Sequence, residues 1–351
     1  MPKVLVGMSG GVDSAVAAYL LKKAGFDVTG VTLRTQSAES RCCEIDDARE
    51  SAMKIGIPFY PLNCIEDFQA KVTEPFIESY LKGETPNPCV ICNRAVKWER
   101  LLYYAKAVGA DFVATGHYAS VVRLENGRYT VKKGAYADKD QSYMLYRLSQ
   151  EQLAATLMPL GSYSKEEVRT IARDAGLKVS EKPDSQEICF VTEGDYAGYI
   201  EAQYIGDLPG EGNFVDTEGN VLGRHKGIIH YTVGQRRGLE LAMGYPVYVK
   251  SIDPERNEVV VARDEELYGS EVLCRDLNFL SIHGLSEGEE LRCLAKIRYR
   301  HEAAPAVLKM REDGSLLIAF DEPVRAAAPG QSAVFYDEDG FVIGGGIISR
   351  E

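Results

Sequence analysis

The stretch that decides the fold is Lys3-Val4-Leu5-Val6-Gly7-Met8-Ser9-Gly10-Gly11-Val12-Asp13-Ser14, a glycine-rich loop between an apolar run and a helical pattern. Lys3–Met8 predicts a strand, and Ser14–Ala24 predicts a helix that ends at Gly25. The glycines allow a phosphate to approach the backbone, and the helix start directs N–H groups at that anion. No Lys-Ser or Lys-Thr follows the glycines, so this is not the usual loop for a γ-phosphate. We therefore predict a nucleotide loop, with Asp13 as a candidate Mg²⁺ ligand.

Outward from this loop, apolar runs continue to alternate with helical patterns. Asp27–Leu33 and Ile57–Leu62 predict two more strands, and Asp46–Ile55 predicts a helix with Asp46 as its N-cap. Three further elements follow: the helix Asn93–Val108, the strand Asp111–Thr115, and the helix Lys165–Ala175 behind a capping box of Ser164 and Glu167. Strands that alternate with helices predict an α/β fold, a Rossmann-like parallel sheet with helices on both faces.

The pattern changes after Tyr204, where the turn-rich segment 206–212 begins. Short alternating runs follow, such as Val247–Ile252 with Glu258–Ala262, and Ala306–Met310 with Leu316–Phe320. Closely spaced strands predict small barrels or sandwiches. We expect an ATP-binding catalytic domain over residues 1–205 and two small β-rich domains, a central one over 206–270 and a C-terminal barrel over 271–351.

Composition limits the function classes. The 351 residues are 45% hydrophobic and carry a net charge of -12, and no apolar run approaches the roughly 20 residues that cross a bilayer. Met1-Pro2-Lys3 is not typical of a signal peptide, so we expect a cytoplasmic protein with no membrane partner. Residues 292–311 carry six lysines and arginines against one glutamate, and residues 221–250 carry five against one. These basic segments could hold nucleic acid on an acidic protein, or they could be solvated strand faces.

Two of the eight cysteines stand out as reactive thiols. Cys92 ends Pro86-Asn87-Pro88-Cys89-Val90-Ile91-Cys92 just before a predicted helix capped by Asn93, where the helix dipole favours a thiolate. Cys189 ends Asp184-Ser185-Gln186-Glu187-Ile188-Cys189. We interpret Cys64, Cys274 and Cys293 as buried small hydrophobes and favour a structural role for Cys42 and Cys43. A zinc site would need a second Cys-x-x-Cys, which the sequence lacks.

Strand ends add candidate nucleotide contacts, because open α/β sheets bind ligands beyond the carboxyl ends of their strands. Leu33 ends the second predicted strand, and Gly116-His117-Tyr118 follows the strand Asp111–Thr115. Gly116 would allow adenosine to approach the backbone. His117 at this place is either catalytic or structural.

The loop Ser9–Ser14 resembles that of the PP-loop ATP pyrophosphatases, which adenylate a carbonyl oxygen. Together with the two cysteine motifs, Gly116–Tyr118 and Lys139-Asp140-Gln141-Ser142-Tyr143, it makes nearly the whole chain resemble the bacterial tRNA-specific 2-thiouridylases. The resemblance extends through residues 230–239 to Pro329-Gly330-Gln331-Ser332-Ala333-Val334.

This resemblance implies two sets of binding residues. The implied ATP contacts are Gly7, Met8, Ser9, Gly10, Gly11, Val12, Asp13, Ser14, Leu33 and Gly116. The implied tRNA contacts are Asn87, Pro88, Cys89, His117, Lys139, Asp140, Gln141, Arg298, Tyr299 and Gln331. Arg298 also lies inside the most basic segment.

The resemblance further implies a reaction: sulfur insertion at C2 of the wobble uridine of tRNAs for Lys, Glu and Gln, with release of AMP and pyrophosphate. Cys189 would carry a persulfide, and Cys92 would be the second catalytic thiol, leaving a Cys92–Cys189 disulfide. A cysteine desulfurase or a sulfur-relay protein would supply the sulfur. Thiol exchange of this kind needs one donating and one resolving thiol.

The chain departs from the family at Cys89, where many members have Asp. Cys89 is thus a third candidate catalytic residue, and its thiol could exchange protons. Two alternatives stay open. Cys89, Cys92 and Cys189 could hold a [4Fe–4S] cluster for the same reaction, or the chain could be another PP-loop tRNA ligase. From a different functional class, the alternative is a non-catalytic RNA-binding protein.

Overall fold

The computed structural model describes residues 1–36, 45–183, 188–191 and 194–350. Its first domain is built on a five-stranded parallel sheet in the order β3-β2-β1-β4-β7, which confirms the predicted fold class. The strands are β1 Lys3–Gly7, β2 Asp27–Arg34, β3 Phe59–Asn63, β4 Phe112–Ala114 and β7 Thr156–Leu157. Strand β1 lies between β2 and β4, so the loop after it lies near the middle of the sheet's carboxyl edge.

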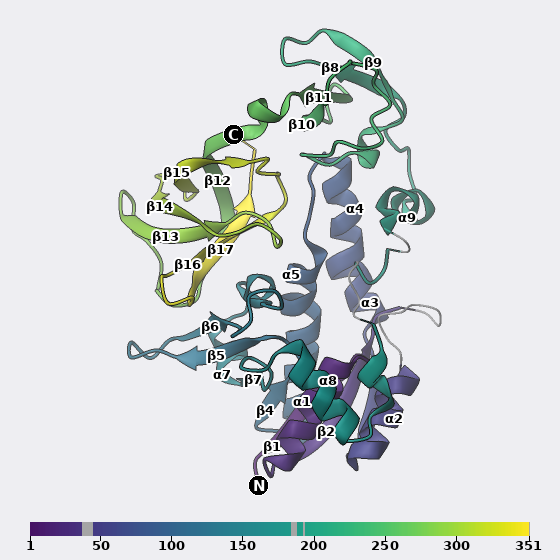
Figure 1. The fold of residues 1–351 in the computed structure, drawn as a ribbon, viewed down its shortest axis with the longest axis vertical. Coiled ribbons are helices and arrows are strands. Elements are labelled where there is room, and N and C mark those ends of the chain that lie inside the picture. Colours follow the sequence, from purple (N-terminus) through teal and green to yellow (C-terminus); the bar gives the residue numbers. More distant parts are fainter. Residues whose placement is uncertain (37–44, 184–187, 192–193, 351) are drawn as a thin grey trace.

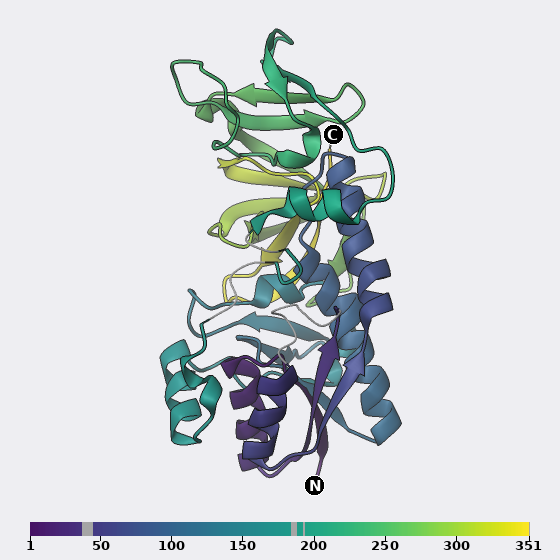
Figure 2. The same ribbon diagram turned by 90° about the vertical axis from the view of Figure 1, so that its right-hand side faces the viewer.

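Helices cover both faces of this sheet (Figures 1 and 2). On one face α1 Val12–Lys23 packs with α2 Ile45–Ile55 and α8 Lys165–Asp174 through small and branched side chains. The capping box of Ser164 and Glu167 is confirmed. The N-cap prediction for Asp46 was wrong, because α2 already includes Ile45 and Asp46 lies in its first turn.

A second helical segment, on the other face, begins five residues before its predicted start. It runs through α5 Pro88–Cys92, a π-helical turn Asn93–Trp98 and α6 Glu99–Val108. Pro88 lies in the first turn, where its missing N–H costs no helical hydrogen bond. Asn93 therefore does not cap the helix. Among the described residues, the other α-helices of this domain are α3 Ile65–Phe68, α4 Glu74–Leu81, α7 Gln150–Ala154 and α9 Tyr196–Gln203.

The middle module has a four-stranded sheet in the order β10-β11-β8-β9. Its strands are β8 Gly212–Val215, β9 Val221–His225, β10 Tyr248–Asp253 and β11 Glu258–Ala262. The predicted pairing of β10 with β11 is confirmed. Phe214, Tyr231 and Val249 belong to a core that this module does not share with the first domain's sheet.

The C-terminal module is a closed antiparallel barrel in the order β12-β15-β14-β13-β16-β17. Its strands are β12 Tyr268–Phe279, β13 Glu290–Lys296, β14 Ala304–Met310, β15 Leu316–Arg325, β16 Ser332–Tyr336 and β17 Val342–Ile348. The predicted hairpin of β14 and β15 is confirmed. Closure leaves no unpaired strand edge.

The barrel packs on the first domain through a hairpin that the sequence patterns did not reveal, β5 Ala119–Arg123 with β6 Tyr129–Lys133 (Figure 1). Arg128 donates to the carbonyls of Phe279 and Leu280, each at 2.8 Å. Buried residues of both domains, including Trp98 and Tyr336, form one apolar cluster. The barrel and the sheet thus share a core. Among the described helices, none combines the length and apolar character needed to cross a membrane.

Candidate nucleotide and thiol site

The phosphate loop is closed by its own serine hydroxyls. The backbone N–H of Ser9 donates to Ser14 Oγ at 3.1 Å, and Ser14 Oγ donates to the carbonyl of Gly11 at 3.1 Å. Gly10 has φ +79°, a conformation that favours glycine. Gly11 is the N-cap of α1 and supplies no side-chain acceptor. The loop and the N-terminal turn of α1 thus have the geometry expected of an anion cradle, and the ATP contacts stay predictions.

Gly116 packs on this loop from the end of β4. A Cβ atom there would lie 2.6 Å from the carbonyl carbon of Asp13 and 2.6 Å from the nitrogen of Ser14. Its missing side chain therefore makes room for the backbone of the phosphate loop. The approach of adenosine to the Gly116 backbone stays a prediction.

Two lysines that the sequence analysis did not single out bring positive charge to the loop. Lys165 Nζ lies 2.7 and 2.9 Å from the carboxylate oxygens of Asp13, which also accepts a 2.6 Å hydrogen bond from the Tyr118 hydroxyl. The Lys165 side chain is only 12% exposed. Lys182 Nζ donates to the Gly10 carbonyl at 3.2 Å and pairs with Asp47 at 2.7 Å. The one sequence feature that could have drawn attention to Lys165 is its position directly after the Ser164 N-cap, at the start of a predicted helix.

Cys89 and Cys92 lie in one helical turn, α5, between the sheet and the barrel (Figure 1). Cys92 is 8% exposed and belongs to an apolar cluster with Phe76 and Phe190. Cys189 and Leu33 pack against the same cluster. Both predicted catalytic thiols therefore take part in one apolar cluster, which Leu33 of β2 also contacts. Cys42, Cys43 and the predicted motif residues Asp184–Glu187 lie outside the described residues.

The described cysteines are all free thiols in different environments. Burial raises the pKa of Cys89, and the nearby charge of Lys97 opposes that rise. At neutral pH the Cys89 side chain is therefore a thiol rather than a thiolate. Cys64, Cys274 and Cys293 are buried, as predicted. Burial raises the pKa of Cys293 to about 12, which keeps that thiol inert.

The donors for a metal are not assembled in this arrangement. Over the part of the chain that the structure describes, which includes Cys89, Cys92 and Cys189, no three histidine, cysteine or acidic side chains come together as a metal-binding group. The three thiols thus do not form the donor set that a [4Fe–4S] cluster requires.

His117 is held as a neutral imidazole. Its Nδ1 lies 2.8 Å from Thr115 Oγ1, and its ring packs on Trp98 with 5.5 Å between centroids. Burial, with a smaller contribution from Lys97, lowers the pKa of His117 to about 3. At neutral pH this side chain therefore offers hydrogen bonds but no positive charge to a phosphate.

The other predicted tRNA residues lie around the same region, and several are engaged within the protein. Asp140 is buried and accepts hydrogen bonds from Gly134 and Ser142. Gln141 accepts one from the Tyr118 N–H at 3.0 Å, and Tyr299 donates to the Asp140 carbonyl at 3.2 Å. The amide of Asn87 lies 3.7 Å from the sulfur of Met144, while Pro88 is buried. Lys139 is half-buried.

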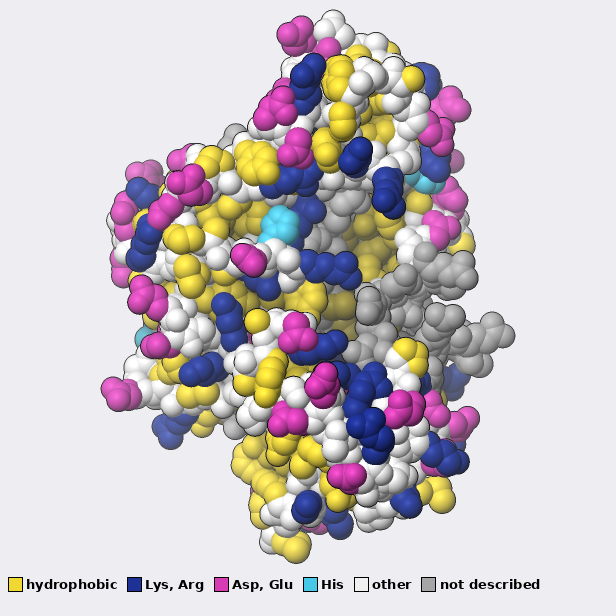
Figure 3. Space-filling model, viewed as in Figure 1, with side chains coloured by type: hydrophobic (Ala, Val, Ile, Leu, Met, Phe, Trp, Pro, Cys, Tyr) yellow, Lys and Arg dark blue, Asp and Glu magenta, His cyan; other side chains and the backbone are white. Residues whose placement is uncertain are grey.

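Two predicted tRNA residues lie where domains meet. Arg298 donates to the carbonyls of Val233 at 2.8 Å and Ala326 at 2.7 Å, which ties the middle module to the barrel. Gln331 donates to the carbonyl of Thr85, just before α5, at 2.7 Å. Figure 3 shows Lys and Arg side chains around the hollow between the three domains. The tRNA contacts stay predictions.

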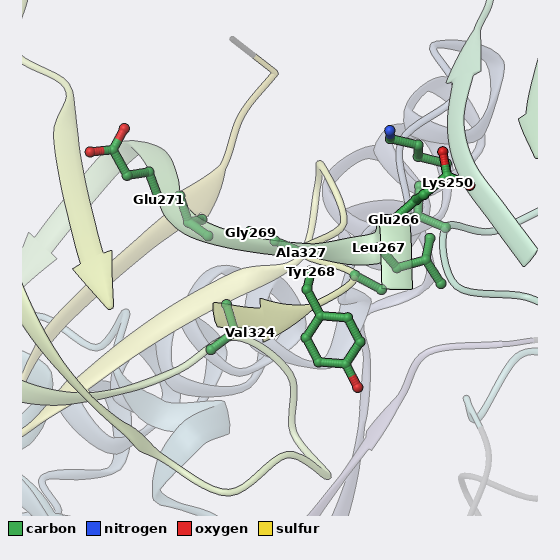
Figure 4. A pocket seen from close by; sticks show the side chains of 11 residues that line it. Lys250, Glu266, Leu267, Tyr268, Gly269, Glu271, Val324 and Ala327 are labelled. Carbon is green, nitrogen blue, oxygen red and sulfur yellow. The ribbon is translucent and has the colours of Figure 1, made fainter. Parts of the chain in front are cut away.

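A separate shallow cavity lies between the barrel and the middle module (Figure 4). Its lining comes mainly from β12 and from the end of β15 with the residues just after it, together with Lys250 from β10 and Glu266 from the turn before β12. None of the predicted ATP-binding or catalytic residues lines it.

Comparison with known proteins decides the family. Three family models match in succession: "tRNA methyl transferase HUP domain" over residues 2–193, "tRNA methyl transferase PRC-barrel domain" over 201–263, and "Aminomethyltransferase beta-barrel domain" over 270–348. A tRNA-specific 2-thiouridylase MnmA of Lachnoclostridium phytofermentans is 51% identical, with 100% of both chains covered. The MnmA of Acetivibrio thermocellus is 50% identical over 99% of each chain.

The chain belongs to the tRNA-specific 2-thiouridylase (MnmA) family. Among solved structures, the U34-tRNA thiolase NcsA of Methanococcus maripaludis with its [4Fe–4S] cluster is similar over 53% of this chain and 60% of that one. It has a TM-score of 0.36 and 21% identity. Likeness at that level carries no argument about the chemistry of this MnmA-family chain.

Proposed function

We propose that the protein uses ATP to replace the C2 oxygen of the wobble uridine of tRNA by sulfur. The products are 2-thiouridine, AMP and pyrophosphate. We take tRNAs for Lys, Glu and Gln as the substrates and a persulfide on Cys189 as the sulfur carrier. A cysteine desulfurase or sulfur-relay protein would load that persulfide.

One observation supports the proposal: both thiols belong to or pack against an apolar cluster that also contacts the end of β2, the strand beside β1 and its loop. Cys92 and Cys189 belong to the apolar cluster that Leu33 joins at the end of β2. Strand β2 pairs with β1, and Met8, which leads into the loop, donates to the Val31 carbonyl at 2.7 Å. A nucleotide on the loop and a base beside the thiols would therefore be neighbours, as adenylation followed by sulfur transfer requires.

The chemistry follows from the poor reactivity of a uracil carbonyl. Adenylation of O2 makes AMP the leaving group, and the terminal sulfur of the Cys189 persulfide attacks C2. Cys92 then attacks the Cys189 sulfur, which forms a Cys92–Cys189 disulfide and releases the thiolated base. A thiol reductant must restore both thiols. The target base has to leave its stack to reach buried thiols.

Charges around the loop suit a departing pyrophosphate. Lys165 and Lys182 lie at Asp13 and at the Gly10 carbonyl. Asp13 with phosphate oxygens is a fitting partner for Mg²⁺, which binds few carboxylates together with substrate phosphates. Its carboxylate would first have to release Lys165. Bound Mg²⁺ would neutralise phosphate charge.

The test uses protein that is purified without oxygen and stripped of metal by a chelator. It is mixed with ATP, Mg²⁺, a persulfide donor and unmodified tRNA for Glu, and 2-thiouridine is quantified by mass spectrometry. We expect product, and none from a tRNA with cytidine at position 34. Product only after iron and sulfide are restored would overturn the persulfide carrier and favour a cluster.

Cysteine variants separate this reaction from that of another PP-loop ligase. Cys189→Ser and Cys92→Ser should abolish sulfur transfer, while Cys293→Ala, a buried barrel thiol outside the site, should retain it. An ATP-consuming product that persists in Cys189→Ser would identify a ligase without sulfur chemistry. Binding of tRNA with no release of AMP from wild-type protein would favour a non-catalytic RNA-binding protein.

A further inference from the structure

We propose that Gln331 of the barrel is a positioning residue for the thiols: it holds the segment Thr85–Pro86 and thereby sets the position of Cys89 and Cys92. The resemblance predicted Gln331 as a tRNA contact. The inference rests on the proposed function for its catalytic meaning, but the contact itself lies within the protein and requires no RNA.

Hydrogen bonds run in both directions between the barrel segment 329–331 and the segment Thr85–Pro86. Gln331 Nε2 lies 2.7 Å from the carbonyl oxygen of Thr85 and 3.4 Å from that of Pro86. In return, the N–H of Thr85 donates to the carbonyl of Pro329 at 2.8 Å. Between them Gly330 has φ +88°, and a Cβ there would lie 3.0 Å from the Thr85 nitrogen. The barrel segment 329–331 therefore follows the backbone before α5 closely.

These hydrogen bonds can influence the position of the thiols because the chain from Thr85 to Cys89 has little backbone freedom. Pro86 and Pro88 each fix a backbone φ angle, and Pro88 begins the helical turn that contains Cys89 and Cys92. Asn87 at the N-cap makes no side-chain capping bond. With no cap holding the start of α5, the residues before it have more influence on where the turn begins.

The barrel segment next to Gln331 is itself hydrogen-bonded to the first domain. Tyr143 donates from its hydroxyl to the Ser332 carbonyl at 2.7 Å, directly after Gln331. Ser332 Oγ donates to the Tyr146 hydroxyl at 3.2 Å. Both tyrosines are fully buried in the shared core. Gln331 thus connects this anchored segment of the barrel to the helical turn that contains Cys89 and Cys92, and its removal should loosen that turn without disturbing the shared core.

The decisive experiment measures the thiols without RNA or ATP. Alkylation of Cys89 and Cys92 by iodoacetamide is followed by peptide mass spectrometry in wild type, Gln331→Ala and Gln331→Glu. Glutamate has nearly the same shape but no donor for the two carbonyls. We expect alkylation about tenfold faster in both variants, the factor that loss of one good hydrogen bond corresponds to. We also expect a lower kcat for 2-thiouridine formation with an unchanged KM for tRNA.

Two comparison variants make the result specific. Gln203→Ala, at the exposed end of α9, should leave both readouts unchanged. Arg300→Ala, in the basic segment, should raise the KM for tRNA and leave alkylation unchanged. If Gln331→Ala and Gln331→Glu behave like Arg300→Ala, Gln331 is an RNA contact and the inference is wrong. Because alkylation involves no tRNA, its outcome is independent of whether wild-type protein makes 2-thiouridine.

Discussion

The two β modules differ in how they are joined to the catalytic domain. The barrel shares a buried cluster with the parallel sheet, and its strand β17 accepts a 2.6 Å hydrogen bond from Thr130 at the Val342 carbonyl. The middle module has its own core. It meets its neighbours through single buried residues, Ile229 in the cluster of Cys92 and Val233 beside Ala326, and through hydrogen bonds such as that of Tyr196 with the His230 carbonyl. The barrel therefore shares a large core with the sheet, whereas the middle module is built on a core of its own and joins the other two domains through smaller contacts.

This difference suggests a division of labour. A shared core transmits small displacements because interiors are close-packed, which suits the barrel for positioning the thiol turn. The middle module carries basic residues on a sheet with a core of its own, which suits it for holding RNA backbone.

The largest expected effect comes from truncating one core residue in each unit. Tyr336→Ala removes a fully buried ring from the shared cluster and should destabilise barrel and sheet together by about 3–5 kcal/mol. Phe214→Ala removes a similar ring from the middle module and should open that module alone. Hydrogen exchange followed by mass spectrometry distinguishes them. Equal loss of protection in the sheet for both variants would contradict the comparison.

Arg128→Ala tests the junction of the barrel with the hairpin β5–β6. Its guanidinium donates to two barrel carbonyls, so we expect a loss of about 2–3 kcal/mol of unfolding free energy, measured by urea titration. The matched change is Arg224→Ala, an exposed arginine that pairs within the middle module; it should cost less than about 1 kcal/mol. Similar losses for the two would mean that the barrel junction is no stronger than a surface contact.

The pH dependence should also separate the two units. The folded protein keeps His117 neutral, with its pKa lowered to about 3, whereas the unfolded chain takes up a proton below about pH 6.5. The unfolded state then binds more protons, so stability is full at pH 7 and falls as the pH drops from 6.5 toward 3. The loss is at most about 1.4 kcal/mol per pH unit.

Since His117 packs on Trp98 of the shared core, this loss belongs to the sheet and barrel. Urea titrations of wild type and His117→Asn between pH 7 and 5 measure it, with His225→Asn in the middle module for comparison. We expect His117→Asn to weaken the pH slope of the sheet and barrel, and His225→Asn, whose pKa burial also lowers, to weaken that of the middle module. An unchanged slope in His117→Asn would assign the pH dependence to other groups.

The smallest effect on stability is expected at the basic surface of the middle module. Arg236→Ala and Arg237→Ala should leave the unfolding free energy within about 0.5 kcal/mol of wild type. Each should weaken tRNA binding and reduce the slope of log K against log salt by about one, measured by filter binding. An unchanged salt slope in both variants would mean that this segment is the solvated face left open by the sequence.

The sequence alone determined what local rules control. The loop Ser9–Ser14, its strand and its helix follow from glycine, the helix N-terminus and apolar periodicity, so the geometry of the loop and the α/β class were predictable. The capping box before α8 and the β14–β15 hairpin are local in the same way. The motif residues were also sufficient to predict the family.

Only the tertiary structure decided which distant groups meet. The pairing of Lys165 with Asp13 spans 152 residues, and that of Gln331 with Thr85 spans 246. Asn93 is not the N-cap of its helix because Pro88 begins that helix earlier. Gly116 is needed because the backbone of Asp13 and Ser14 packs against it. Such contacts depend on how sheet, barrel and middle module pack, and no spacing along the chain encodes that packing. Burial of apolar surface drives this packing. Because the hydrophobic effect has no direction, only the complete fold shows which surfaces are buried against each other.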